Sequence, residues 1–468
     1  MKKTIRILAL LLCAIMMISL IAACGDNTGK ENETTETVTP TEIQGPDLPD
    51  LTGTPPEETI GRGADVDEDI KLPAYELQDK VVRKLVNADE ALSPQTLIFQ
   101  ENYTYNGEPA EMLFDITTHG EYMNKLITSV MTLDPPDIFS NDFDPSLINK
   151  NIVESVDTMI DFSTKLWAGT QKSHDRYLWN GKHYLVNPMF ARWDVLWYNR
   201  EIFENYGVET PDSLYEKGQW DWNTMRDAAM KLTIDENQDG VYEVFGIAID
   251  DMKFLVPATG KSFVTFNDDG SVTNNMMSPE IARAMQFYVD LYVKDKCVYR
   301  GDDGRDKFVL SQIAMIVGGL WYRTPFQDMV RADKVSFVPY PKDPEADKYY
   351  CTEGANGFFI PKGARNPSGA AAYLSGIRFM YVDQEWLMAD YDKVALDSGW
   401  TMREHEMLWN EVQGPKLNPI PDLSATFGVS SFNADIFVRT REGEPWATIA
   451  AEIAPMIQDN IDRLMSER

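Results

Sequence analysis

The 468-residue sequence has few of the residues that build metal centres and nucleophilic active sites, with only four Cys and four His. The cysteines form no C-x-x-C pair, and no histidine has HExxH spacing or accompanies a G-x-S-x-G turn. P-loop and dinucleotide-binding fingerprints are missing as well. These absences argue against zinc, serine-hydrolase and nucleotide chemistry. Catalysis by paired carboxylates stays open, because such residues meet in space and not in sequence.

Basic residues are scarce compared with acidic ones, 43 Lys and Arg against 74 Asp and Glu, for a net charge of −31. Nucleic-acid binding depends on Lys and Arg contacts to phosphates, so a nucleic-acid partner is excluded. The length exceeds one ordinary domain and predicts two α/β lobes. With 11 Trp, 20 Tyr and 21 Phe, the chain has aromatic residues to spare for a binding site.

The N-terminus carries a targeting signal. A basic start is followed by an apolar run over 7–21 and by Ile21-Ala22-Ala23-Cys24, which resembles the lipobox of bacterial lipoproteins. We therefore predict a signal peptide over 1–23, lipidation (palmitate) of Cys24 and a polar tether over 24–73. The alternative is an uncleaved transmembrane anchor, for which the run is marginal in length.

Lipidation of Cys24 would leave two thiols in the mature protein, Cys297 and Cys351. An exported compartment permits a disulfide between them. Two buried free thiols are the equal alternative, because the sequence does not show whether the two residues are neighbours.

Residues 179–203 form the segment around which the chain is organised. An Asn180-Gly181 turn is followed by expected strands at 183–186 and 195–198, and a helix begins near Arg200. The irregular connector 187–194 lies between the two strands. Such a segment could carry the chain from one lobe to the other, or it could be an ordinary βα unit.

Periodicity predicts the remaining elements. Strands are expected over 81–86, 96–99, 137–140, 314–317, 335–338 and 355–361, and helices over 121–132, 279–292, 368–381 and 446–464. Another helix is expected after an N-cap at Asn223, with Trp220 and Trp222 as core residues. The polar residues 141–144 should form a loop at the carboxyl end of a strand, where α/β sheets bind ligands, or a loop that binds nothing.

An acidic loop over 235–246 matches the beginning of a calcium-binding loop. The oxygen ligands would be Asp235, Asn237, Asp239, the Val241 carbonyl and Glu243. The final position holds Gly246, where a bidentate Glu belongs, so a metal-free Asx turn is the alternative.

A glycine pair, Gly318-Gly319, ends the expected strand 314–317 just before Trp321. Glycine allows backbone and ligand to approach closely. Trp321 is therefore a candidate ligand contact, and core packing is its alternative.

The order and spacing of several segments resemble the family 1 extracellular solute-binding proteins, the sugar-type substrate-binding lipoproteins of ABC importers. The matching segments are PPDIFSND, IVESVDTMIDFS, WNGKHYLVNP, VLWYNREIFENYGVETP, GQWDWNTMRDAAMKLTIDENQDG, QIAMIVGGLW, FVPYPKDP and EGANGFFIPKGARNPSGAAAYL. The resemblance implies a two-lobed periplasmic-binding-protein-like fold (type II) with the ligand cleft between its lobes. Hinges would fall at 187–194 and 337–342. Lobe 1 would comprise 74–190 and 343–398, and lobe 2 with the C-terminal helices 191–342 and 399–468.

The resemblance also implies ligand-binding residues. They are Asn141, Asp142, Arg192, Trp193, Trp321, Asn356 and Phe427. Trp400 lies where this chain departs from the family pattern, so no role is assigned to it. Aromatic faces stack on sugar rings, and Asp, Asn and Arg hydrogen-bond to hydroxyl groups, so the set suits a carbohydrate.

The expected function is capture of a carbohydrate, an oligosaccharide, and its delivery to an ABC transporter permease. The protein would be a lipid-anchored monomer on the extracellular face of the bacterial cell membrane. It would have no enzymatic activity and would require no cofactor apart from the calcium discussed above. The alternatives are a binding protein for a peptide, polyamine or other solute, and a surface glycoside hydrolase or lyase.

Overall fold

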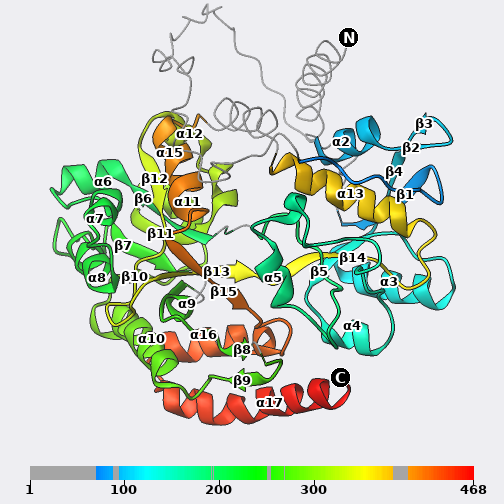
Figure 1. Cartoon of the computed structure of the whole chain (residues 1–468). Coiled ribbons are helices and arrows are strands. Elements are labelled where there is room, and N and C mark those ends of the chain that lie inside the picture. The colour runs from blue at the N-terminus through cyan, green and yellow to red at the C-terminus, as the bar shows by residue number, and fades with distance from the viewer. Residues whose placement is uncertain are drawn as a thin grey trace, which may run out of the picture. The chain divides into compact units, whose positions relative to one another are not determined.

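The computed structural model describes residues 70–87, 94–190, 192, 194–249, 254–267, 269–382 and 399–468 (Figure 1). These residues belong to the compact unit Pro56–Ala91 and Gln95–Arg468, except for Pro94. Cys24, the predicted signal peptide and most of the predicted tether lie outside the described residues. No helix within the described ranges is long and apolar enough to cross a membrane.

A five-stranded sheet has the order β10-β7-β11-β6-β12. Its strands are β6 (Asp194–Asn199), β7 (Phe245–Ile249), β10 (Val298–Tyr299), β11 (Ile313–Gly319) and β12 (Val335–Val338). Strands β10, β7 and β11 are parallel, and β6 runs antiparallel to both of its neighbours, β11 and β12. Strand β12 has the predicted bounds, and β6 and β11 contain the predicted strands. These strands are buried almost throughout, as expected for a sheet covered on both faces.

A second group of strands has the order β4-β1-β5-β14. It contains β1 (Val81–Val86), β4 (Glu111–Ile116), β5 (Phe139–Asp142) and β14 (Asn356–Phe359). β1 pairs with β4 in parallel, and β14 pairs antiparallel with β5. A bridge from Lys84 to Ile138, the residue before β5, links the two pairs. A separate parallel pair joins β13 (Tyr349–Gly354) to β15 (Leu417–Asp422), and the short hairpins are β2–β3 (Thr104–Tyr105, Glu108–Pro109) and β8–β9 (Val264–Phe266, Val272–Asn274).

The helices surround these strands (Figure 1). The α-helices are α2 (Pro94–Asn102), α3 (Tyr122–Met131), α4 (Pro145–Asn149), α5 (Gln171–Asp175), α6 (Arg200–Asn205), α7 (Pro211–Glu216), α8 (Trp222–Lys231), α9 (Leu255–Ala258), α10 (Pro279–Val289), α11 (Gly304–Val309), α12 (Gln327–Arg331), α13 (Pro367–Met380), α15 (Met402–Glu406), α16 (Asn433–Arg441) and α17 (Trp446–Ser466). Two π-helices, η4 (Asp290–Lys294) and η6 (Met407–Val412), and four 3₁₀ turns, η1 (His119–Glu121), η2 (Lys165–Trp167), η5 (Leu320–Arg323) and η7 (Val429–Phe432), complete the described elements.

Three sequence predictions require correction. Residues 96–99, expected as a strand, lie in α2, where Phe99 packs edge-on against Tyr373 at 5.7 Å. Helix α8 is capped by Asp221 and not Asn223, because the Asp221 carboxylate accepts the Thr224 N–H and the Thr224 hydroxyl accepts the Asp221 N–H. Of the strand expected at 183–186, the structure shows only a bridge from Val186 to Phe358.

Other local predictions are confirmed. Asn180 and Gly181 have φ values of 53° and 70°, as a tight hairpin turn requires, and Trp179 and Lys182 exchange backbone hydrogen bonds across it. Trp220 and Trp222 are buried. Cys297 and Cys351 are free, buried thiols, and burial raises the pKa of each to about 12, so neither is a ready nucleophile.

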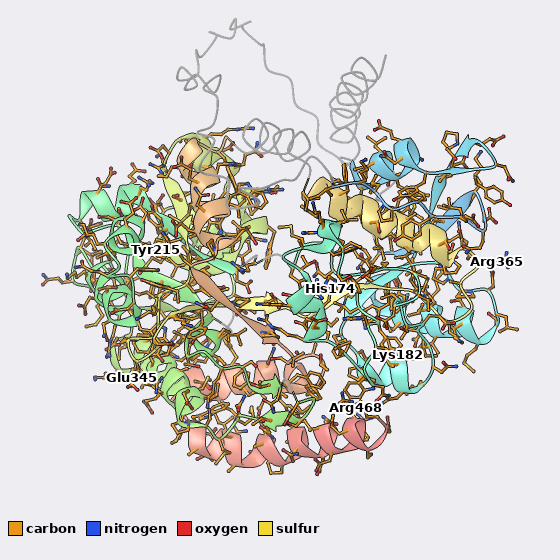
Figure 2. The ribbon with its side chains drawn as sticks, in the orientation of Figure 1. His174, Lys182, Tyr215, Glu345, Arg365 and Arg468 are labelled. Atoms are coloured by element: carbon orange, nitrogen blue, oxygen red, sulfur yellow. The ribbon has the colours of Figure 1, made fainter. Side chains whose placement is uncertain are left out.

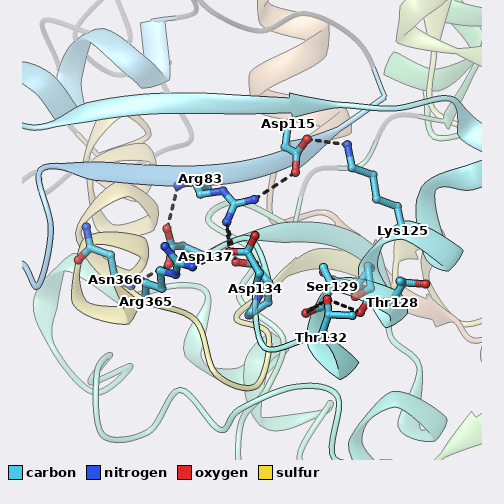
Figure 3. Close-up of polar contacts among 12 residues, drawn as sticks. Arg83, Asp115, Lys125, Thr128, Ser129, Thr132, Asp134, Asp137, Arg365 and Asn366 are labelled. Atoms are coloured by element: carbon cyan, nitrogen blue, oxygen red, sulfur yellow. Dashed lines mark hydrogen bonds and ion pairs between the residues drawn. The ribbon is translucent and has the colours of Figure 1, made fainter.

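A polar network fixes the start of β5 (Figure 3). The buried Asp137 carboxylate accepts the backbone N–H groups of Arg83 at 2.8 Å and Asn366 at 2.7 Å, although burial raises its pKa. The Arg83 guanidinium in turn pairs with Asp134 at 2.8 Å and Asp115 at 3.5 Å. These contacts join β1, β5 and the start of α13, and they set the position of the β5 residues that follow.

The connector that precedes β6 is held by two buried side chains. His174 on α5 (Figure 2) donates from Nδ1 to the Thr170 carbonyl at 2.9 Å and accepts the Asn187 N–H at Nε2, at 3.1 Å. Arg378 donates to the Pro188 carbonyl at 2.9 Å. Because Nε2 must accept a hydrogen bond, the observed geometry requires a neutral imidazole. Burial favours the same state and lowers the pKa of His174 to about 3.

The low pKa of His174 predicts a pH dependence of stability. As the pH falls, His174 takes up a proton near pH 6.5 in the unfolded state and only near pH 3 in the folded state. The stabilisation that neutral His174 provides is therefore complete above pH 6.5 and is lost as the pH falls towards 3. Between these limits His174 should add a slope of about 1.4 kcal/mol per pH unit to the free energy of unfolding. His174→Gln should remove that slope in urea titrations at several pH values. The exposed His119→Gln is the control, and equal slopes in His174→Gln and the unmodified protein would contradict the prediction.

Candidate functional site

The register of β6 and β11 places two candidate segments at one edge of the five-stranded sheet. Gly319, the last residue of β11, is paired with Asp194, the first residue of β6. The connector 187–194 therefore reaches the sheet at the same edge from which the segment after β11 continues to Trp321. The Trp197 indole N–H donates to the Gly319 carbonyl at 3.1 Å and fixes this edge further.

Trp321 lies in η5 and is 59% exposed, which excludes core packing as its role. Its ring lies directly over Gly319, where a Cβ atom would come within 2.0 Å of the indole. Tyr322 packs edge-on against it, with ring centroids 6.2 Å apart. The result is a large, exposed aromatic surface whose position depends on glycine at 319.

A second group of candidates lies where β5 and β14 pair. Asn356 is opposite Asp142, and Gly357 is opposite Asn141. Asp142 and Asn356 are exposed and Asn141 is half-buried. The expected loop at 141–144 is therefore wrong for its first two residues, which belong to β5. The pairing brings together the side chains of Asp142 and Asn356, which are 214 residues apart in sequence, whereas Asn141, opposite Gly357, lies on the other face of the strand pair.

Asn187 joins the connector to this group. Its side-chain amide donates to the Asn356 carbonyl at 2.7 Å, and its Oδ1 accepts the N–H groups of Met189 and Phe190. Sequence analysis did not single out Asn187 as a site residue. The Asn-Pro pair at 187–188 is a turn signal that marks it.

Arg192 has a structural role in the described conformation. Its guanidinium donates to the carbonyls of Val412 at 3.2 Å and Gly414 at 2.7 Å, and its backbone exchanges hydrogen bonds with the Gln413 side chain. Its Nε is buried without a partner. A ligand contact from Arg192 stays a prediction, and Trp193 lies outside the described residues.

Phe427 is buried in the described conformation. It is 1% exposed within the main hydrophobic core, together with Leu423 and Val429. The structure thus gives Phe427 a packing role after β15, and contact with a ligand stays a prediction. Trp400, left without a role, is also buried and packs against Phe337 with centroids 5.4 Å apart.

A buried charged cluster on β13 was missed by sequence analysis. Glu353, 2% exposed, accepts hydrogen bonds from Ser173 Oγ at 3.2 Å and Arg176 Nη1 at 3.1 Å. Burial raises the pKa of Glu353, and the adjacent Arg176 guanidinium opposes that rise. The nearby Tyr177 hydroxyl is buried without a partner. No sequence pattern links residues 173–177 with 353, so only the fold reveals this cluster.

The acidic loop forms a network of its own. Asp235 accepts the N–H groups of Asp239 and Gly240, Asn237 accepts the N–H of Asp239 and donates to Glu243, and Asp239 accepts the N–H of Val241. Among the described residues, no group of three or more His, Cys, Asp and Glu side chains is arranged to hold a metal. Calcium binding through Asp235, Asn237, Asp239, Val241 and Glu243 stays a prediction.

A family model described as bacterial extracellular solute-binding protein matches residues 112–383, more than half of the chain. The chain belongs to this family. A comparison with curated proteins finds no match.

Solved structures of solute-binding proteins show the same fold. One is an ABC substrate-binding protein from Listeria monocytogenes in complex with cycloalternan, with 18% identity over 82% of this chain and 97% of that chain, and a TM-score of 0.56. Another is the cyclic α-maltosyl-1,6-maltose binding protein from Arthrobacter globiformis (17% identity, 83% and 99% coverage, TM-score 0.59). A third is UgpB from Mycobacterium tuberculosis in complex with glycerophosphocholine (15% identity, 82% and 99% coverage, TM-score 0.58). The fold of this solute-binding protein is the two-lobed type II α/β fold.

Replacement of Trp321 tests whether the exposed ring binds ligand. In Trp321→Ala, loss of an aromatic anchor should weaken sugar binding at least about thirtyfold, which corresponds to about 2 kcal/mol. The free energy of unfolding should change by less than about 1 kcal/mol, because the ring is exposed. Calorimetric titration and a urea melt measure the two effects. Tyr206→Ala, which removes another part-exposed ring, should bind normally, and unchanged affinity in Trp321→Ala would remove it from the site.

Proposed function

We propose that this solute-binding protein captures a carbohydrate, an oligosaccharide, outside the cell and delivers it to an ABC transporter permease. The main support is the exposed Trp321 ring beside the connector, since aromatic rings stack on the apolar faces of sugars. Asn141, Asp142 and Asn356 offer the directional hydrogen bonds that sugar hydroxyls require. Several neighbours in fold were solved with oligosaccharides, among them cycloalternan and maltotetraose.

A non-sugar solute is the second candidate, because one neighbour in fold was solved with glycerophosphocholine. An enzymatic function has less support, since the family consists of binding proteins. The proposal includes the lobe and hinge boundaries given above, a monomeric state and a structural role for calcium in the loop 235–246.

A thermal-shift screen with mono- and oligosaccharides, glycerophosphocholine, oligopeptides and polyamines tests the proposed ligand class. A ligand at a free concentration of 100 times Kd stabilises the folded state by about 2.7 kcal/mol, so a true ligand should raise the melting temperature clearly. We expect oligosaccharides to give the largest shifts, with and without a calcium chelator. Stabilisation by peptides, polyamines or glycerophosphocholine alone would contradict the carbohydrate proposal.

We also propose that Cys24 carries the lipid that holds the protein on the extracellular face of the membrane. Cys24→Ala should leave folding and ligand binding intact and release the protein from the membrane fraction, because the change removes only the thiol that would carry the lipid. Cys13→Ala, in the same N-terminal segment, is the matched control and should stay in the membrane. Retention of Cys24→Ala through an uncleaved N-terminus would favour a transmembrane anchor.

A further inference from the structure

A surface cavity of about 660 Å³ is lined in part by Val298 and Tyr299 of β10. β10 is an edge strand of the five-stranded sheet (Figure 1). The wall of the cavity includes Phe245, which is paired with Ile313, the first residue of β11. Trp321 follows the other end of β11, and a strand of this length spans about 20 Å. The cavity is therefore separate from the candidate sugar site, and none of the residues predicted for that site lines it.

Aromatic rings form a continuous wall of this cavity. Tyr242 packs edge-on against Phe245 with centroids 5.3 Å apart, and Phe245 packs edge-on against Tyr299 at 5.1 Å. The Tyr299 hydroxyl donates to Asp303, which holds its ring in place. Tyr242 is 36% exposed and offers a free ring surface. A wall of this kind suits a ligand with a flat or apolar ring face.

Cations gather at the same cavity in a chain whose net charge is −31. Arg300 and Arg441 lie over the Tyr292 ring, with guanidinium carbons 5.5 and 5.9 Å from its centroid, and Lys296 is a third cation in the lining. Their counterpart in the lining is one carboxylate, Glu442.

The two guanidinium groups are fixed through the backbone and not by carboxylates. Arg300 donates to the Tyr292 carbonyl at 2.9 Å, and Arg441 donates to the Arg300 carbonyl at 2.6 Å. Neither arginine forms an ion pair with any residue that the structure describes. A guanidinium has five N–H donors, so each retains donors for the oxygens of an anion.

We infer that this cavity is a second binding site, for a sugar that carries a carboxylate or a phosphate. The anion binds to Arg300 and Arg441, and the sugar ring lies against Tyr242 and Phe245. Guanidinium groups suit both anions because they bind carboxylate and phosphate through two parallel hydrogen bonds. Trp321 does not line this cavity, so binding here does not depend on which sugar the candidate site at Trp321 binds.

Calorimetric titration of the full chain with glucuronate, glucose 6-phosphate, glucose and inorganic phosphate tests the site. At least one of the anionic sugars should bind saturably and at least about tenfold more tightly than glucose and inorganic phosphate. Arg300→Gln/Arg441→Gln should weaken that binding at least about tenfold, and high ionic strength should weaken it as well. Tyr242→Ala, a surface change that leaves the cations in place, should weaken it severalfold.

Two controls show whether binding depends on this cavity, and not on the net charge of the protein or on Trp321. Arg305→Gln/Lys348→Gln makes the same change of net charge at exposed residues outside the cavity and should bind normally. Trp321→Ala should lose the transported sugar and retain the anionic one. Absence of saturable binding, unchanged binding in Arg300→Gln/Arg441→Gln, equal affinity for inorganic phosphate, or loss of binding in Trp321→Ala would each overturn the inference. Melts of every variant show that it is folded.

Discussion

The antiparallel pairing of β6 with β11 is the constraint on which the candidate site depends. On its other side β11 is parallel to β7, which therefore ends at the same edge as β11. β6 is antiparallel to β11, so β6 begins at that edge and the connector that precedes it lies there. The Gly319–Asp194 pair places the connector beside Trp321, and the Trp197 indole hydrogen bond to Gly319 holds that register. A slip of one residue would turn the side chains of one strand to the opposite face and disrupt their packing in the core on both sides of the sheet.

The connector is fixed at both ends by polar groups that are themselves buried or half-buried. At its start, His174 and Arg378 bind the backbone of residues 187 and 188, and at its end Arg192 binds the carbonyls of residues 412 and 414. These hydrogen bonds are made to backbone groups, so they define the path of the chain whatever side chains follow. One of these hydrogen bonds depends on pH, because a protonated His174 imidazole could not accept the Asn187 N–H.

Sequence patterns predicted the elements whose signals are local. The segments 81–86 and 335–338 form strands with the predicted bounds, and the Asn180-Gly181 pair forms the predicted turn. Residues 96–99 failed because tertiary packing of Phe99 against Tyr373 overrode strand propensity. The contact of Glu353 with Arg176 and the burial of Phe427 depend on segments that are distant in sequence, and no periodicity reports such contacts. The exposure of Trp321 was therefore predictable, because its signal is local, and the charged cluster was not.

The glycine pair before Trp321 is the local pattern that predicted an exposed ring, and the structure shows why glycine is needed there. A Cβ atom at Gly318 would come within 2.3 Å of the Tyr322 ring, and one at Gly319 within 2.0 Å of the Trp321 ring. Glycine weakens a strand, so its use at the end of a buried one needs a compensating purpose. Core packing does not explain the glycine at 319, because Trp321 above it is exposed, whereas the other described tryptophans are buried or half-buried. An exposed aromatic face at the edge of the sheet is what glycine permits here, and the proposed stacking of a ligand on that face is the purpose we expect it to serve.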